Sequence, residues 1–421
     1  MRKITTLFLA LTALIPTLSA KKVNMAEQPF FPIYGHNMLW LIDEEMVKDQ
    51  VDMGLTMITI YGDQQELDWC EKYGMKTIIY RHNGIDKYIY NSGEADMEQN
   101  LINMVNTYKD HPTFYAFQVT DEPSKRVYDN YAKVYKTLKT TAPKIPIYTN
   151  FFPSWSQPNQ HGFTDYEEYV ETFCKLFAGD KKSQPFIYDN YCNKDLRLKP
   201  AERLASFLEN LDTVERITSK YGLDFWVTVL SSQHDHYPEP TAADLDFQVF
   251  TSLAYGAKGI GYFITNSHQN LNFQGGPFNF LGDKTPTYYN LRELNFRVRQ
   301  LAPVLEKLKF QGAYYSLIMK DKAAFKKYPM HKALPGKLVK SVVSDRGNCS
   351  FLVTELKDDK GDVWIFVVNL SLENIAHFTP TLVEGKTLQH FNSYTGQLFP
   401  KTYVDPWLRP GQGKLYKVVD K

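Results

Sequence analysis

The chain repeats one arrangement of apolar and polar residues, in which an amphipathic stretch ends in glycine and a short apolar run follows. Four of these glycines are Gly54, Gly74, Gly222 and Gly256. Glycine readily takes the left-handed conformation that closes a helix. The apolar runs that follow lack clean alternation, which is typical of strands buried on both faces of a parallel sheet.

Extended along the chain, this pattern predicts eight strands with helices between them. The strands are expected at residues 32–37, 55–61, 75–81, 113–120, 145–150, 185–190, 224–231 and 258–265. The helices are expected at residues 43–53, 64–73, 95–109, 124–141, 164–178, 200–220, 241–255 and 287–305. Eight strand–helix units in roughly 285 residues predict a (β/α)8 TIM barrel. A doubly wound open sheet is the competing fold, but the Gly-rich phosphate turn it usually needs does not follow the first strand.

The pattern changes after about residue 308, where short strand-like runs are separated by turn signals such as D-R-G-N and D-D-K-G-D. We therefore expect an α/β barrel domain over residues 21–308 and a small all-β sandwich domain over residues 309–421. The second domain carries no concentration of acids or histidines, so no chemistry is assigned to it.

The first twenty residues form a separate element. Arg2 and Lys3 precede a mostly apolar stretch, which ends in the small residues Ser19 and Ala20. This pattern predicts a cleaved secretory signal peptide, because the stretch is short for a membrane span. No cysteine lies near the expected cleavage point. The protein is thus expected to be secreted or periplasmic, with no integral membrane segment after cleavage.

Charge and cysteine content narrow the possible functions. The 421 residues include 48 basic and 47 acidic side chains, and this balance gives no electrostatic reason to expect a nucleic-acid partner. The four cysteines (Cys70, Cys174, Cys192 and Cys349) lack paired metal-ligand spacing. Cys174 and Cys192 could form a disulfide, or all four could be buried thiols.

The predicted strands end in polar residues, at the end of a TIM barrel where catalytic groups lie. Residues expected to bind substrate from these positions are Arg81, His82, Asn150, Tyr188, Gln233 and Asn266. Such a mixture of side chains suits the hydroxyl groups of a sugar. The long loop after the eighth strand, rich in Asn, Gln, Gly and Phe, could line an extended carbohydrate cleft or simply pack over the barrel rim.

The fourth predicted strand ends in two acids, Asp121 and Glu122, followed by Pro123. This ending resembles the clan of (β/α)8 glycoside hydrolases that includes β-galactosidase-like and cellulase-like enzymes. The stretch A-Y-G-A-K-G-I-G-Y-F at 254–263 is similar to that clan's approach to the eighth strand. P-G-Q-G-K-L-Y-K-V at 410–418 is similar to the last strand of the β-domains such enzymes often carry. The resemblance implies a carbohydrate substrate, no cofactor, and Glu122 as the general acid/base.

General chemistry agrees with a catalytic role for Glu122. A glycosidic oxygen leaves poorly unless it is protonated as the bond breaks. The neighbouring charge of Asp121 is expected to raise the pKa of Glu122 and so keep its proton available. The alternative is that the two acids cap the following helix, although Ser124 could do this alone.

The sequence departs from the clan at the seventh strand, where the resemblance implies a nucleophilic Glu. The chain reads V-T-V-L-S-S-Q-H-D-H there, and Glu239 follows only in a later loop. Asp189, at the end of the sixth strand, and Asp235 are candidate replacements, although an internal salt bridge, for example to Arg81, is the plain alternative for Asp189. A third possibility is that Asp121 orients the N-acetyl group of the substrate, which then acts as the nucleophile.

Two functions of other classes stay open. His234 and His236 could bind a metal together with Asp189, His82 or His36, as in a metal-dependent hydrolase or deacetylase. Isolated His-x-His spacing is common, however, so no metal site is expected. A barrel without its nucleophile could instead bind glycans without cleaving them.

Overall fold

The computed structural model describes residues 23–37, 42–80, 84–91, 95–180, 183–267, 272–328, 331–399 and 403–421. The expected signal peptide, residues 1–20, and the candidate site residues Arg81 and His82 lie outside these ranges.

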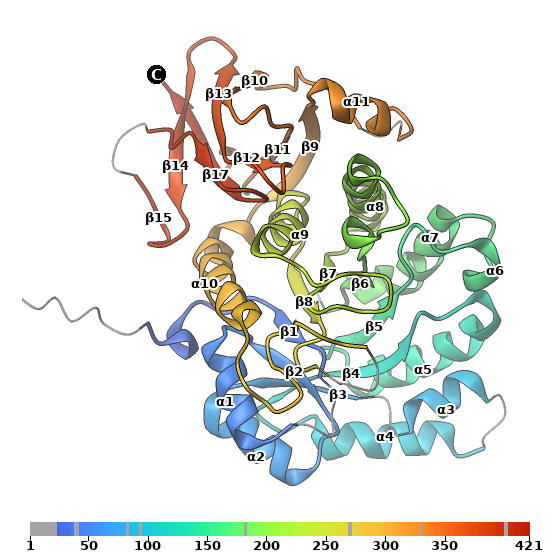
Figure 1. The fold of residues 1–421 in the computed structure, drawn as a ribbon. Helices are drawn as coiled ribbons and strands as arrows, with labels where there is room; N and C mark the ends of the chain where they lie inside the picture. Colours follow the sequence, from blue (N-terminus) through green and yellow to red (C-terminus); the bar gives the residue numbers. More distant parts are fainter. Residues whose placement is uncertain are drawn as a thin grey trace, which may run out of the picture.

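Eight parallel strands close into a barrel in chain order, with helices around it (Figure 1). The strands are β1 (Ile33–Gly35), β2 (Met57–Ile60), β3 (Lys76–Ile79), β4 (Phe114–Asp121), β5 (Ile147–Phe151), β6 (Phe186–Asp189), β7 (Phe225–Leu230) and β8 (Gly259–Phe263). The larger helices are α1 (Glu44–Asp52), α2 (Gln64–Tyr73), α4 (Met97–Tyr108), α5 (Tyr128–Thr141), α7 (Tyr166–Phe177), α8 (Pro200–Tyr221), α9 (Ala242–Ala254) and α10 (Pro286–Leu305). The predicted (β/α)8 barrel is confirmed, and the open sheet is excluded.

Three short helices were not predicted. They are α3 (Ile85–Tyr90), α6 (Pro158–His161) and α11 (Met319–Phe325). Each spans at most two turns, which is too short for a 3.6-residue period to stand out in a sequence.

One buried side chain from each of the strands β1 to β7 fills the barrel interior. These residues are Tyr34, Met57, Ile78, Ala116, Tyr148, Ile187 and Trp226. β8 faces them with Gly259 and Gly261, because a Cβ there would lie 2.5 Å from the Trp226 ring and 2.1 Å from the Tyr34 ring. The barrel interior is thus a packed core. In barrels of this kind, catalytic groups lie at the carboxyl-terminal mouth.

The C-terminal domain is a pair of antiparallel sheets, which confirms the predicted all-β sandwich. One sheet has the order β10-β13-β16, and the other has the order β15-β14-β17-β12-β11-β9. The strands are β9 (Lys309–Ser316), β10 (Val339–Arg346), β11 (Phe351–Lys357), β12 (Val363–Asn369), β13 (Ala376–Leu382), β14 (Lys386–Asn392), β15 (Gln397–Leu398), β16 (Trp407–Leu408) and β17 (Gly413–Asp420). A separate apolar cluster that includes Val342, Ile365, Phe378 and Tyr416 packs between the sheets.

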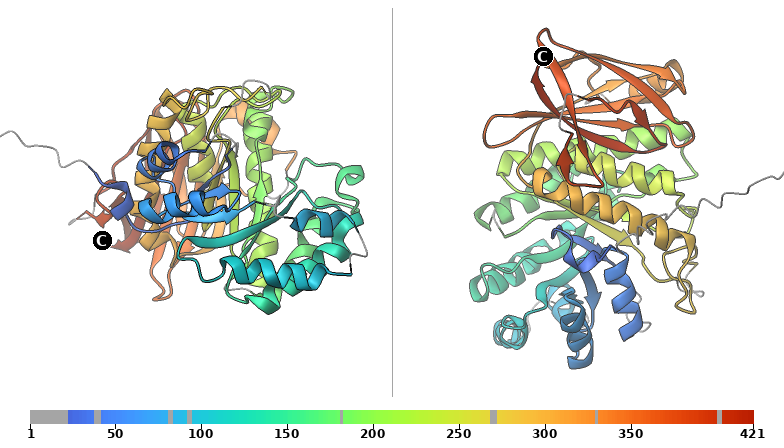
Figure 2. Two further views of the ribbon diagram at one scale, coloured as in Figure 1. Left: turned by 90° about the horizontal axis from the view of Figure 1, so that it is seen from below. Right: turned by 90° about the vertical axis from the view of Figure 1, so that its left-hand side faces the viewer.

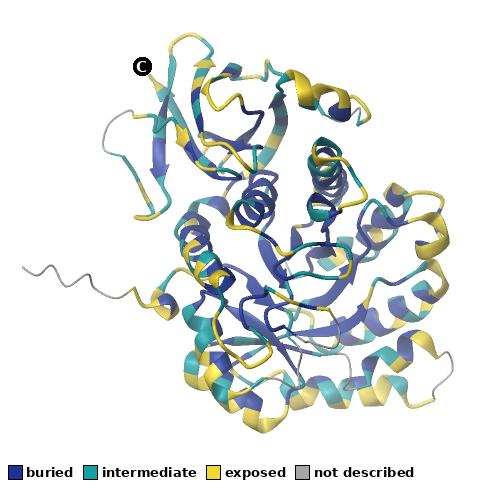
Figure 3. Cartoon of the chain, viewed as in Figure 1, coloured by how far each residue is buried: buried dark blue, intermediate teal, exposed yellow. Residues whose placement is uncertain are grey.

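The outer face of the six-stranded sheet packs on barrel helix α9 (Figure 2). Phe366 of β12 meets Phe250 of α9 with ring centroids 6.2 Å apart. Gly413 permits this approach, since a Cβ there would lie 2.8 Å from the Cβ of Phe250. Phe366 and Phe250 belong to the same hydrophobic cluster as the barrel's outer layer, so buried residues run continuously from barrel to sandwich (Figure 3).

All four cysteines are buried and free, so Cys174 and Cys192 do not form a disulfide. Among the residues described here, no helix has the length and apolar character needed to cross a membrane.

Candidate active site

The end of β4 is irregular, and this irregularity determines which way its acids point. The register of β4 against β5 shifts between Gln118 and Thr120. A bulge of this kind reverses the alternation of side chains beyond it. Gln118 pairs with the interior-facing Tyr148 before the shift, and Asp121 pairs with Asn150 after it. Asp121 therefore shares the inner face of the barrel with Asn150.

Glu122 follows directly with φ at +45°, a left-handed conformation that non-glycine residues seldom adopt. Its backbone N–H donates to the carbonyl of Asn150 at 2.7 Å, which holds this strained turn against β5. Backbone strain of this kind persists where the surrounding structure fixes it, often at functional sites.

A chain of hydrogen bonds crosses the mouth from β4 to β1. Asn150 Nδ2 donates to Asp121 Oδ1 at 3.4 Å, and Thr228 Oγ1 donates to Asn150 Oδ1 at 3.3 Å. The hydroxyls of Thr228 and Tyr34 are 2.8 Å apart. Asn150 is thereby fixed between an acid of β4 and a hydroxyl of β7, with its amide orientation determined by both.

Glu122 is a carboxyl group that resists ionisation. Burial raises its pKa to about 9, with further contributions from the charges of Asp189 and Asp121. The group therefore keeps its proton at neutral pH, as a general acid must.

Asp189, at the end of β6, is the second perturbed acid. It is 8% exposed. Burial raises its pKa to about 7, as does the charge of Asp121, while hydrogen bonds from Tyr191 and Asn150 oppose the rise. Its Oδ1 atom has no hydrogen-bond partner, and the carboxylate forms no ion pair with any described residue. One acid that is protonated and another that titrates near neutrality thus share the mouth.

Several aromatic rings pack together at the mouth of the barrel. His36 Nε2 and the Tyr148 hydroxyl share a 2.6 Å hydrogen bond, and burial lowers the pKa of His36 to about 4, so this imidazole is neutral. Phe263, at the end of β8, stacks on Tyr191 with centroids 5.6 Å apart. Such a wall provides a low-dielectric lining and ring faces against which the C–H groups of a sugar could lie.

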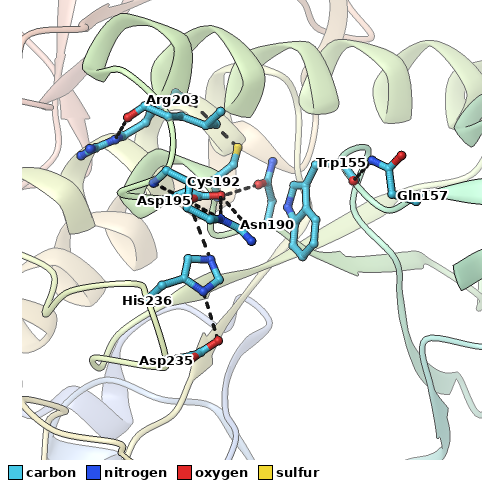
Figure 4. Close-up of polar contacts among 10 residues, drawn as sticks. Trp155, Gln157, Asn190, Cys192, Asp195, Arg203, Asp235 and His236 are labelled. Atoms are coloured by element: carbon cyan, nitrogen blue, oxygen red, sulfur yellow. Dashed lines mark hydrogen bonds and ion pairs between the residues drawn. The ribbon is translucent and has the colours of Figure 1, made fainter.

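The end of β7 contributes no glutamate. The strand ends at Leu230 and continues as Ser231-Ser232-Gln233. Glu239 is exposed and lies against Gly275 of the loop after β8. Asp235 is exposed as well, with its Oδ2 3.1 Å from Nδ1 of His236 (Figure 4).

The two histidines after β7 take part in separate contacts. His234 stacks on Phe273 with centroids 4.8 Å apart. Nε2 of His236 lies 3.7 Å from Asp195 (Figure 4). The carboxylate of Asp195 also accepts a hydrogen bond from Arg197. No group of three metal-binding side chains occurs among the described residues.

The expected sugar-binding residues that the structure describes do not all lie at the acids. Asn150 lies in the mouth beside the acids. Gln233 is at the rim, where its Nε2 donates to Asn272 Oδ1 at 3.1 Å and ties the loop after β8 to β7. Tyr188 lies fully buried in the main core, and Asn266 is fully buried with its amide 3.7 Å from Met46 Sδ. The structure thus does not bring these last two side chains to the acids.

Three residues of the mouth were given no role from the sequence. They are Tyr34, Thr228 and Tyr191. The sequence does contain a signal for the last two, because side chains two positions apart in an extended chain point to the same side. Tyr191 comes two positions after Asp189, and Thr228 comes two positions before the buried Leu230.

The chain matches no protein-family model and no curated protein. Its fold is shared with solved structures of distant sequence. A β-galactosidase from the psychrophilic Marinomonas ef1 superposes with a TM-score of 0.58 at 9% identity, covering 92% of this chain and all (100%) of that one. A glycoside hydrolase family 5 protein from Bacteroides vulgatus gives 0.53 at 11% identity, covering 93% and 89%. A further protein, described as a glycoside hydrolase, gives 0.54 at 11% identity, covering 93% of both chains.

Proposed function

We propose that the protein is a glycoside hydrolase that cleaves glycosidic bonds in an oligo- or polysaccharide, with Glu122 as general acid/base. The observation that carries this proposal is a protonated carboxyl group at the mouth end of β4, with a pKa raised to about 9 by burial and by two neighbouring acids. The fold shared with glycoside hydrolases supports it.

In the first step Glu122 donates its proton to the glycosidic oxygen while the bond from that oxygen to the anomeric carbon breaks. The positive charge that develops on the sugar ring is stabilised by the carboxylates of Asp121 and Asp189. Asn150, fixed between Asp121 and Thr228, is oriented to bind a sugar hydroxyl.

Asp189 is our candidate for the second catalytic carboxylate. It could attack the anomeric carbon, in a retaining reaction, or deprotonate the attacking water, in an inverting one. Its free Oδ1 atom and its pKa near 7 suit either role. On an N-acetylhexosaminide the substrate's own acetamido oxygen would be the nucleophile, and Asp121 would orient it. Knowing which sugar the protein accepts would distinguish the route through Asp189 from the route through the acetamido group.

Binding without cleavage is the second candidate function. It is favoured by one observation, namely that β7 ends in Leu230 without a glutamate. A protein of this kind would bind glycans at the same mouth and show no turnover.

The test is turnover by residues 21–421 on a panel of glycans and aryl glycosides that includes N-acetylhexosaminides. Glu122→Gln is measured beside the parent protein, and Glu98→Gln, at an exposed position in the first turn of α4, serves as the control. Glycan turnover that disappears only in Glu122→Gln supports the hydrolase. Binding by all three proteins with no turnover in any supports the lectin, and glycan turnover unchanged in Glu122→Gln contradicts the site.

A further inference from the structure

The C-terminal domain has a cavity of about 540 Å³, far along the chain from the barrel acids. It lies between helix α11 and strand β10, on the part of the sandwich that stands above α8 in Figure 1. A cavity of this volume is within the range of sites that hold small molecules, roughly 300–1,000 Å³.

The lining of this cavity is positively charged. Lys322 and Lys326 contribute from one wall, Lys340 contributes from the other, and no Asp or Glu lines the cavity. None of these exposed lysines forms an ion pair with a described residue. The nearby acid Asp321 instead accepts a 2.6 Å hydrogen bond from Ser350. Three like charges therefore line one space, and no described residue pairs with them.

The sequence around the cavity is also predominantly positively charged. Residues 318–340 contain seven lysines and one acid, in a chain whose formal net charge is +1. The excess of positive charge is thus local, and long-range attraction of anions would be directed to this face of the sandwich.

Polar and aromatic groups in the same lining suit a sugar. His331 stacks on Tyr315 with centroids 4.7 Å apart and 8° between the planes, and Tyr328 is also stacked on it. Both ring nitrogens of His331 lack a hydrogen-bond partner. Buried polar atoms normally have a hydrogen-bond partner. A polar group that enters the cavity would provide that partner for His331.

From the charge, the volume and these rings we infer that the cavity is a second carbohydrate-binding site, specific for an acidic glycan that carries carboxylate or sulfate groups. The lysines pair with the anionic groups, the ring nitrogens of His331 hydrogen-bond to sugar hydroxyls, and Tyr328 contacts a sugar ring. The inference depends on the proposed function only for the choice of a glycan as the anion. The barrel mouth is not part of this site.

The test measures binding by calorimetry, with oligogalacturonate and a sulfated dextran as acidic probes and unmodified dextran as the neutral one. The variant carries Lys322→Gln, Lys326→Gln and Lys340→Gln. Its matched control carries Lys48→Gln, Lys133→Gln and Lys136→Gln, three exposed lysines on barrel helices with the same total charge change.

We expect the parent protein to bind an acidic probe, the control to bind it equally, and the cavity variant to lose at least about tenfold in affinity. Binding should weaken when salt is raised from about 0.05 M to about 0.5 M. Glu122→Gln should bind like the parent, so a failed hydrolase proposal would not affect this result. The single variants Lys326→Gln and Lys340→Gln repeat the comparison if the triple variant is unstable.

Four results would overturn the inference. They are no binding of either acidic probe by the parent, equal binding of neutral dextran, an equal loss of affinity in the control variant, and binding of anionic phospholipid vesicles in place of the glycans.

Discussion

Asp189 at the barrel mouth and Asp246 on α9 are about equally buried, with 8% and 7% of their surfaces exposed. Their surroundings are opposite. Asp246 accepts a 2.6 Å hydrogen bond from the buried guanidinium of Arg297, and Arg409 approaches it at 3.6 Å. Asp189 has no cationic partner among the described residues, and its acidic neighbours are the carboxylate of Asp121 and the protonated carboxyl of Glu122.

Burial raises the pKa of both acids, but among the described residues arginines oppose the rise at Asp246 and not at Asp189. An uncompensated buried carboxylate destabilises a fold, whereas a paired one is tolerated. The contrast indicates that Asp246 has a structural role between the barrel and the sandwich. Acids that repel one another in a cleft are instead typical of sites that transfer protons.

The largest expected effect is on turnover in Asp189→Asn. If Asp189 is the second catalytic carboxylate, kcat should fall by about 10³-fold with the fold intact. Steady-state kinetics beside circular dichroism would measure this. Unchanged turnover, together with loss in Asp121→Asn on an N-acetylhexosaminide, would transfer the role to the acetamido group.

Asp246→Asn should affect stability and spare the chemistry. Removing the carboxylate leaves the charge of Arg297 buried, with Glu293 3.7 Å away as its remaining acid, so unfolding should become easier by about 3 kcal/mol. Urea unfolding would measure the loss, and activity per folded molecule should not change. A stability equal to that of the parent would remove the contrast between the two acids.

The pH dependence of kcat/KM should be bell-shaped and lie on the alkaline side of neutrality. Activity requires Asp189 ionised, so it rises as pH passes about 7, and it requires Glu122 protonated, so it falls as pH passes about 9. Because the two acids interact, the apparent pKa values of the rising and falling limbs describe the pair and not either residue alone. A maximum near pH 5 would show that the mouth does not raise their pKa values.

A second expected effect of Asp189→Asn is a gain in stability. The folded-state pKa of Asp189 is raised from 3.8 to about 7, so its destabilising charge is absent below pH 4 and complete above pH 7. The variant and the parent should therefore unfold alike near pH 4. Above pH 7 the variant should be more stable, by at most about 4 kcal/mol. Thermal unfolding across this range would detect it, and a variant less stable than the parent at pH 8 would argue that Asp189 holds the mouth together.

The sequence was sufficient to predict the barrel because several of its helices are followed within two residues by glycine and its strands are short, mostly apolar runs. The position of Glu122 also followed from the abrupt end of one such run. Strand-end position does not show which face a side chain occupies. Tyr188 directly precedes Asp189 and must therefore point the other way, into the core.

Other features could not be seen in one sequence, because they depend on contacts between distant strands. The bulge that turns Asp121 inward is a mismatch between β4 and β5. The hydrogen bond between Tyr34 and Thr228 joins residues 194 positions apart.

The central claim, that Glu122 protonates the leaving group, is tested most directly by comparing two substrates of the same sugar. One is a dinitrophenyl glycoside, whose leaving group departs without a proton, and the other is an oligosaccharide, whose leaving group needs one. The account predicts that Glu122→Gln loses at least about 100-fold in kcat/KM on the oligosaccharide and little on the dinitrophenyl glycoside. Equal losses on both substrates would contradict it and assign Glu122 a role in binding or folding.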